Sequence, residues 1–311
     1  MHFDVTMAVG SFLVAIVVGL TGMGGGALMT PMLVTFFGVP PLTAVSSDLV
    51  ASAVMKPVGS VVHLRRGTVH LKLVGWLCLG SVPAAFCGVL IARALGSGEA
   101  TQHFIEIAMG VALLIAASGI VYRLYQGMRD KKAGAPVETQ AAAPLRMRPV
   151  PTVLVGALGG VVVGITSVGS GSLIIVALLA LYPMLKANQL VGTDLVQAVP
   201  LVAAAALGHI MFGDFQLAVT APLLVGSIPG VYLGARISAH APGDLIRRAL
   251  VVVLVASALK MFGVPVTALA WIIAGFVVAA VAAWIFVAVR RRTAETAAPD
   301  VERTPVPAAE R

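Results

Sequence analysis

The sequence predicts an all-α polytopic membrane protein made of two homologous, inverted repeats with broken or re-entrant helices, about 8–10 membrane segments in all. Three observations lead to this class. Of 311 residues, 59% are hydrophobic and 11% are charged, whereas a soluble domain carries about 25% charged residues. Stretches such as 7–22, 150–163 and 271–289 contain no charge and approach the roughly 20 apolar residues that span a bilayer core. The third observation is an internal repeat.

The apolar segments form two sets, one on each side of a polar stretch. They lie near 4–22, 27–38, 44–63, 71–95 and 104–125, and then near 150–168, 172–184, 190–211, 216–238, 247–263 and 266–289. The polar stretch is basic and contains Ala, Pro and Gly, and the chain end is rich in Ala, Pro, Glu and Thr, a composition typical of disorder. We therefore expect an N-terminal membrane repeat (1–125), a cytoplasmic linker (126–149), a C-terminal membrane repeat with an extra helix (150–292) and a disordered tail (293–311).

The repeat appears when the sequence is compared with itself. A shift of 145 positions aligns residues 19–28 with 164–173, through the pairs Gly19/Gly164, Thr21/Thr166, Gly24/Gly169, Gly26/Gly171 and Leu28/Leu173. A shift of 146 aligns later positions, through the pairs Asp48/Asp194, His63/His209, Gly67/Gly213, Gly80/Gly226, Ser81/Ser227, Pro83/Pro229 and Gly88/Gly234. Apolar residues agree by chance easily, but Asp, His, Pro and Gly in the same order do not.

The relative orientation of the two repeats follows from length and loop charge. One helix over 4–38 would be about 50 Å long, too long for a single crossing of a ~30 Å core, so its glycine break indicates a returning or re-entrant segment. With the linker in the cytoplasm, this count places the basic loop residues inside, as the positive-inside rule requires: Arg65, Arg66, Lys72, Lys186, Arg236, Arg247, Arg248 and 290–292. Each repeat then crosses an odd number of times, so we expect inverted halves, a common transporter plan.

Glycine-rich breaks recur at the same place in both halves, at 22–27 and 166–172. A break inside an apolar run exposes backbone N–H groups at the start of the next half-helix, and such a terminus binds anions. Close helix packing through small residues is the alternative interpretation. The predicted substrate-binding residues at the breaks are Thr21, Gly24, Gly25, Gly26, Thr166, Ser167, Gly169, Ser170 and Gly171.

Two pairs of ionisable residues also repeat. Asp48 and Asp194 precede Leu in each half, and His63 and His209 each precede a glycine turn. We predict gating or proton-coupling roles for these four residues, because ionisable groups near the membrane core are usually functional and histidine titrates near neutral pH. The alternatives are helix capping by the aspartates and loop packing by the histidines. In an inverted arrangement the two histidines lie at opposite membrane faces.

Lys56 breaks the symmetry, because the other repeat has Val202 at the equivalent position. A lone ammonium at that depth costs several kcal/mol unless it is paired or hydrated. We predict that Lys56 binds the substrate anion or pairs with Asp48, two helical turns earlier.

Other classes of function fit poorly. The formal charge of +8 comes from loops and ends rather than from a basic face, so we expect a lipid bilayer and a small anion as partners and no nucleic acid. No His-Glu-x-x-His or Gly-x-Ser-x-Gly pattern occurs, so we expect no enzyme, metal or cofactor. The two cysteines, Cys78 and Cys87, are interpreted as buried inert thiols.

The combined motifs resemble the TauE/SafE family, often called sulfite exporters, over roughly residues 5–262. The resemblance rests on the glycine motif with Pro31 and Gly38-Val-Pro, the Asp-Leu helix starts, the His turns and the Gly-Ser-x-Pro segments at 80–83 and 226–229. It implies a bacterial inner-membrane carrier of sulfite, sulfoacetate or a related sulfur anion. The chain departs from the pattern at Ser46-Ser47, where Gly-Thr is expected, and in its serine-rich second glycine motif. An anion channel, or an uptake carrier for another small organic anion, is the alternative.

Overall fold

The computed structural model describes residues 4–21, 25–96, 98–132, 147–169, 171, 173–182, 185, 187–238, 243–265 and 267–268. The predicted extra helix at 266–289 and the tail at 293–311 lie almost entirely outside these residues, as does most of the predicted linker.

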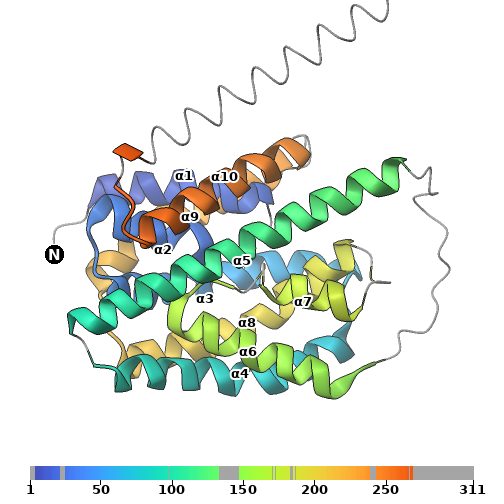
Figure 1. Cartoon of the computed structure of the whole chain (residues 1–311), viewed down its shortest axis with the longest axis horizontal. Coiled ribbons are helices and arrows are strands. Elements are labelled where there is room, and N and C mark those ends of the chain that lie inside the picture. The colour runs from blue at the N-terminus through green and yellow to red at the C-terminus, as the bar shows by residue number, and fades with distance from the viewer. Residues whose placement is uncertain are drawn as a thin grey trace, which may run out of the picture. The chain divides into compact units, whose positions relative to one another are not determined.

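The described part of the chain forms ten α-helices and no strand, which confirms the all-α class (Figure 1). The helices are α1 (Val5–Thr21), α2 (Gly26–Phe37), α3 (Pro41–Arg65), α4 (Leu71–Ala94), α5 (Glu99–Lys132), α6 (Pro149–Thr166), α7 (Leu173–Leu181), α8 (Ala187–Phe212), α9 (Leu217–Ser238) and α10 (Gly243–Met261). Among the described residues, five helical stretches are long and apolar enough to cross a membrane: Leu71–Ala94, Glu99–Tyr122, Pro149–Thr166, Gln189–Phe212 and Leu217–Gly234. The total number of crossings stays a prediction.

Two breaks interrupt the apolar runs where the sequence predicts them. The first separates α1 from α2, and the second separates α6 from α7. In the second break, Ser167, Gly169 and Gly171 have φ angles of 58°, 127° and 109°. The left-handed conformation of Ser167 stops α6, and φ values above 100° suit glycine alone. The glycines therefore allow α7 to start in a new direction.

Helices α4 and α6 pack in direct backbone contact. A methyl group added at Gly80 would lie 2.1 Å from the Val153 carbonyl oxygen, and one added at Gly88 would lie 2.6 Å from the Val161 oxygen. Because both positions advance together along their helices, α4 and α6 are parallel. Small residues permit this approach, which supplies van der Waals contact where lipid offers no hydrophobic driving force.

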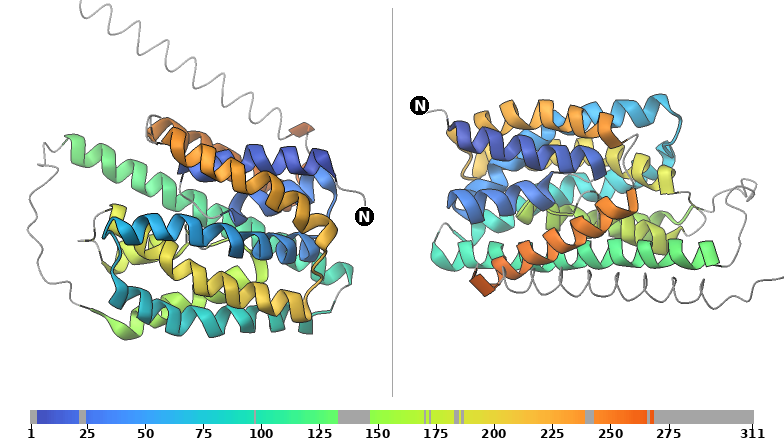
Figure 2. Two further views of the ribbon diagram at one scale, coloured as in Figure 1. Left: turned by 180° about the vertical axis from the view of Figure 1, so that it is seen from behind. Right: turned by 90° about the horizontal axis from the view of Figure 1, so that it is seen from above.

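Helices α1 and α9 pack in the same way. A methyl group at Gly226 would lie 2.0 Å from the Ala8 oxygen, and one at Gly234 would lie 2.2 Å from the Ile16 oxygen. Gly226 and Gly234 are the repeat partners of Gly80 and Gly88, and Ala8 and Ile16 lie 145 positions before Val153 and Val161. The two helix pairs therefore use equivalent residues, and in each pair one helix comes from each half. Figures 1 and 2 show one pair on each side of α3 and α8.

Helices α3 and α8 form the central pair and run antiparallel. Ser46, near the start of α3, contacts His209 at the end of α8, with the Ser46 hydroxyl 2.8 Å from His209 Nδ1. Further along, the Ser60 hydroxyl donates to the Leu195 carbonyl at 2.9 Å. The equivalent helices of the two halves thus face each other head to tail at the centre.

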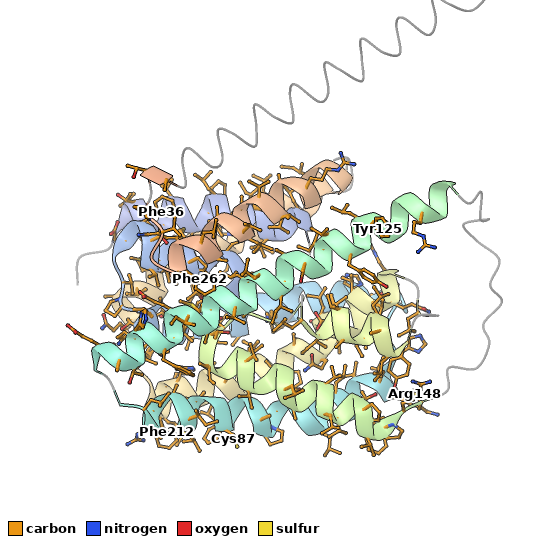
Figure 3. The ribbon with its side chains drawn as sticks, in the orientation of Figure 1. Phe36, Cys87, Tyr125, Arg148, Phe212 and Phe262 are labelled. Atoms are coloured by element: carbon orange, nitrogen blue, oxygen red, sulfur yellow. The ribbon has the colours of Figure 1, made fainter. Side chains whose placement is uncertain are left out.

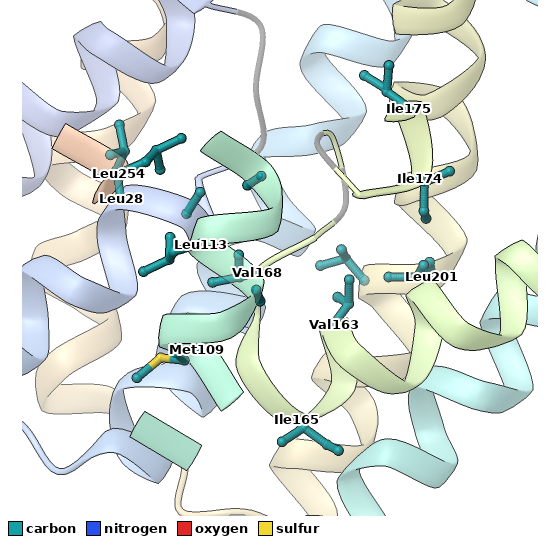
Figure 4. Packing of buried hydrophobic residues seen from close by; sticks show 14 of the residues in the cluster. Leu28, Met109, Leu113, Val163, Ile165, Val168, Ile174, Ile175, Leu201 and Leu254 are labelled. Atoms are coloured by element: carbon teal, nitrogen blue, oxygen red, sulfur yellow. The ribbon is translucent and has the colours of Figure 1, made fainter. Parts of the chain in front are cut away.

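The apolar core lies under α5, which extends obliquely across the bundle (Figure 1). Met109 and Leu113 of α5 are fully buried and belong to one apolar cluster with Val163 and Val168 beside the second break and Leu254 of α10 (Figure 4). Helix α5 continues to Lys132, so the first residues of the predicted linker are helical.

Apolar side chains also cover the outside of the bundle, as a lipid-facing surface requires. Phe36 is 78% exposed and Tyr125 is 54% exposed (Figure 3). Cys87 of α4 is exposed as well and Cys78 is half-buried, so the interpretation of both cysteines as buried thiols is wrong. A cysteine thiol is apolar enough to face lipid, which is why an apolar run alone does not predict its burial.

Candidate functional site

A buried polar cluster surrounds Asp48 in the middle of the bundle. Asp48 has no exposed surface, and its Oδ2 accepts hydrogen bonds from Thr30 Oγ1 at 3.0 Å and Ser167 Oγ at 2.6 Å. Thr30 belongs to α2 and Ser167 to the second break, so one carboxyl oxygen ties α3 to both broken elements. Asp48 Oδ1 has no hydrogen-bond partner among the described residues.

The aspartates do not cap their helices. Helix α3 begins at Pro41 and α8 at Ala187, so Asp48 and Asp194 each lie seven residues, or two turns, inside a helix. Neither helix has an acidic residue in its first turn. The capping interpretation is therefore wrong, and both carboxyls are buried within the central pair, with at most 1% exposure.

Lys56 lies on α3, between Asp48 and Asp194 along the axis of the α3–α8 pair, and is only 7% exposed. Its ammonium interacts electrostatically with Asp194 of α8 and, less strongly, with Asp48. The structure therefore brings together three of the ionisable residues that the sequence singles out, and these come from both halves of the chain. In a low-dielectric interior such charges must be matched to be tolerated.

The two glycine breaks meet at the same level. A methyl group at Gly26, the first residue of α2, would lie 2.0 Å from the Ser167 carbonyl oxygen, so only glycine permits this contact. The N-cap of α2 is Gly25, which makes no side-chain cap hydrogen bond. The Thr166 hydroxyl, at the end of α6, donates to the Val162 carbonyl one turn earlier at 2.7 Å. Three of the predicted residues cannot be placed in the site: Gly24 and Ser170 are outside the described residues, as is the side chain of Thr21.

His209 makes two buried contacts at the end of α8. It is fully buried, with Nδ1 2.8 Å from Ser46 Oγ and Nε2 2.8 Å from the Gly164 carbonyl oxygen. Because a carbonyl only accepts, Nε2 carries a hydrogen and donates it to Gly164, while Nδ1 contacts the Ser46 hydroxyl, which also donates to the Leu42 carbonyl at 2.8 Å. This histidine thus joins α8 to α3 and to the end of α6.

His63, the repeat partner, lies at the opposite end of the α3–α8 pair. Its Nδ1 contacts Thr68 Oγ1 of its own loop at 3.0 Å, and its side chain is only half-buried. It faces Gly192, which offers no hydroxyl where the other end has Ser46; a methyl group at Gly192 would lie 3.0 Å from His63 Nδ1. The two ends of the pair therefore have equivalent positions but different chemistry.

One contributor to the site was not anticipated from the sequence. Ser52 is 1% exposed, its Oγ has no hydrogen-bond partner among the described residues, and a methyl group at Gly25 would lie 3.6 Å from that oxygen. Residues four positions apart share one helix face, and a polar stripe of α3 occupies one such face: Asp48, Ser52, Lys56 and Ser60. The equivalent positions of α8 are Asp194, Ala198, Val202 and Ala206. This spacing is the signal that would have found Ser52.

Fold and site together define a multi-pass helical membrane protein with a charged, buried centre between two broken helices. Among the described residues no group of three or more His, Cys, Asp and Glu is arranged to hold a metal ion.

Comparison with known proteins gives the family. The family model "Sulfite exporter TauE/SafE" matches residues 7–261, so the chain belongs to the TauE/SafE family of membrane transporters. A probable membrane transporter protein of Bacillus subtilis, YjnA, is 40% identical over 226 residues, 72% of this chain and 86% of the relative. A second, YdhB, is 25% identical over 241 residues, 77% of this chain and 92% of the relative. No solved structure matches.

Proposed function

We propose that the protein is a secondary transporter that exports a small sulfur-containing anion, such as sulfite or an organosulfonate like sulfoacetate, across the bacterial inner membrane. The observation that carries this proposal is Lys56, a buried ammonium that interacts electrostatically with two buried aspartates, one of which, Asp48, bonds Ser167 of the second break. A charge at such depth is costly and marks a substrate or ion pathway. The family model supports anion transport, because it is described by sulfite export.

The proposed binding site lies between the two breaks. The N-terminus of α2 offers partial positive charge and lacks a side-chain cap, while Lys56 adds a full charge nearby. From the second break, Ser167 belongs to the proposed site through its hydroxyl, which donates to Asp48 Oδ2 in this structure, and Gly169 and Gly171 shape the turn. The other predicted donors, Thr21, Gly24 and Ser170, belong to the same proposal on sequence grounds alone.

The proposed topology is inverted. Helices α3 and α8 run antiparallel, and α4 runs parallel to α8, because Ser81 bonds Gln197 while Val89 contacts Gly208 further along both helices. Equivalent helices of the two halves pointing in opposite directions support inverted repeats, the arrangement behind many alternating-access transporters.

In this mechanism the histidines act at opposite membrane faces. In this proposal the substrate pathway is closed at the His209 end, where the imidazole contacts Ser46 and Gly164. At the other end the His63 side chain is half-buried and, among the described residues, bonds only within its own loop, so fewer contacts hold that end of the pathway closed. Asp48 and Asp194 take gating or proton-coupling roles beside the bound substrate. For an anion that crosses without a compensating proton, a negative-inside potential favours efflux by about 2.3 kcal/mol per charge per 100 mV.

The test is anion flux in proteoliposomes. Purified protein should exchange labelled sulfite or sulfoacetate, and Lys56→Ala should abolish exchange while Lys72→Ala, at the exposed start of α4, should not. Wild-type flux in Lys56→Ala would remove the proposed site. Currents of channel size would establish the runner-up, an anion channel, and concentrative inward flux would establish an uptake carrier. Fusion of a cytoplasm-active reporter at the N-terminus tests the topology. An odd number of crossings before the cytoplasmic linker places the N-terminus on the opposite side of the membrane, so reporter activity there contradicts the count.

A further inference from the structure

The polar stripe of α3 makes the two halves chemically unequal. At the two interior positions of the stripe, the first half has Ser52 and Lys56, whereas the second half has Ala198 and Val202. Of these two stripes, only the stripe of α3 therefore offers hydrogen-bond donors to a substrate.

Ser52 is placed to receive a ligand. Its hydroxyl is buried, makes no hydrogen bond within the described residues and faces Gly25, the N-cap of α2. A buried hydroxyl without a partner costs about 1–3 kcal/mol, so its retention between Asp48 and Lys56 indicates an absent partner. The uncapped N-terminus of α2 beside it favours negative charge, so that partner is an anion with oxygen atoms that accept hydrogen bonds.

Asp48 lies one turn before Ser52 on the same face, and its two oxygens differ. Oδ2 already accepts from Thr30 and Ser167, whereas Oδ1 accepts from no described residue. An ionised carboxylate repels an anion one helical turn away, with an energy that grows as the local dielectric falls. A proton on Oδ1 removes that repulsion and makes the carboxyl a donor, without disturbing the two bonds at Oδ2.

The charged and titratable groups around Asp48 are few. On its own helix, Lys56 interacts with it electrostatically. On α8, Asp194 interacts with Lys56, and His209 bonds Ser46, two residues before Asp48. The described parts of α2 and of the second break carry no titratable side chain. Asp48 is therefore the acid nearest to Ser52 on the α3 stripe.

We propose that the protein binds a monoanionic sulfonate-type oxyanion together with one proton, with Ser52 Oγ and the Asp48 carboxyl, protonated at Oδ1, both donating to the anion. This assignment rests on the proposed function and deepens it, because it makes Asp48, rather than Asp194 or either histidine, the proton-coupling residue. Anion and proton then move together, and the carboxyl loses its proton when the anion leaves.

The experiment measures binding of methanesulfonate to the purified full-length protein, because this anion keeps its charge between about pH 5.5 and about pH 8. Calorimetry should show affinity falling by up to tenfold per pH unit above the pKa of the free carboxyl, with uptake of about one proton per anion in weak buffer. Asp48→Asn, which retains a donor, should bind independently of pH. Its matched control, Asp194→Asn, should keep the slope. Ser52→Ala should lose about tenfold or more in affinity.

The outcomes separate the two proposals. Wild-type binding with the same affinity at both ends of the pH range and no proton uptake overturns the coupling role of Asp48, while anion transport stands. A pH slope that survives in Asp48→Asn and disappears in Asp194→Asn assigns the proton to the second half. Unchanged affinity in Ser52→Ala removes the hydroxyl from the site. Absence of binding for methanesulfonate, sulfite and sulfoacetate alike overturns the proposed function itself.

Discussion

The contact between α4 and α6 predicts a large difference between two glycine-to-alanine substitutions on one helix. At Gly80 the new methyl carbon would lie 2.1 Å from the Val153 carbonyl oxygen, about 0.9 Å inside the 3.0 Å that real contacts respect. At Gly75, five residues earlier, it would meet no atom within 4 Å. Both changes favour the helix by about 1 kcal/mol, so their difference isolates the packing of the two helices.

Backbone atoms at Val153 cannot rotate away, so α4 and α6 must separate in Gly80→Ala. Overpacking of this kind costs about 1–3 kcal/mol. At about 2–4 °C per kcal/mol for a large domain, the melting temperature should lie roughly 2–12 °C below that of Gly75→Ala. Thermal unfolding of the two purified variants in detergent measures the gap. Gly226→Ala should match Gly80→Ala, because its methyl group would lie 2.0 Å from the Ala8 oxygen. Equal stability of Gly75→Ala and Gly80→Ala would refute the close parallel contact.

Three further outcomes follow from the central contacts. Replacement of His209 by alanine leaves the Ser46 hydroxyl and the Gly164 carbonyl without their shared partner and should lower stability in the same unfolding assay by about 1–3 kcal/mol; an unchanged melting temperature would contradict these two buried contacts. Loss of the Ser60 hydroxyl, which donates to the Leu195 carbonyl, should cost about 1 kcal/mol, and Ser118→Ala, at an exposed hydroxyl on α5, should cost much less. Finally, Gly26→Ala should prevent the two breaks from meeting and abolish anion exchange, and normal exchange would show that the contact is not required.

Hydrophobic pattern predicted the placement of the helices well, because the bilayer demands long apolar runs that soluble proteins lack. The hydrophobic pattern did not predict helix ends that extend beyond the apolar runs. Helix α5 continues to Lys132, since a helix needs no apolar side chains once it leaves the core. Helix α3 starts at Pro41, before the apolar run expected from residue 44.

The candidate site was predicted only in part, for a related reason. Asp48 and Lys56 attract notice because charges are rare in such a sequence, and the structure places both at its centre. Ser52 carries no charge and has no counterpart in the second half, so neither rarity nor repetition draws attention to it. The four-residue spacing places Ser52 on one face with Asp48 and Lys56, but the approach of Gly25 from α2 is a tertiary contact that this spacing does not reveal.

The exchange of partners between the halves has a consequence for biogenesis. Helix α1 packs on α9, with the contact glycines on α9, and α4 packs on α6, with glycines on both helices. Each half therefore exposes a strip of closely packing surface that only the other half covers. The strip on α1 stays uncovered while the ribosome adds about two hundred residues, the sequence interval that separates α1 from α9. Assembly is therefore completed late, and a truncated chain that ends before α9 leaves an unpaired first helix open to membrane quality control.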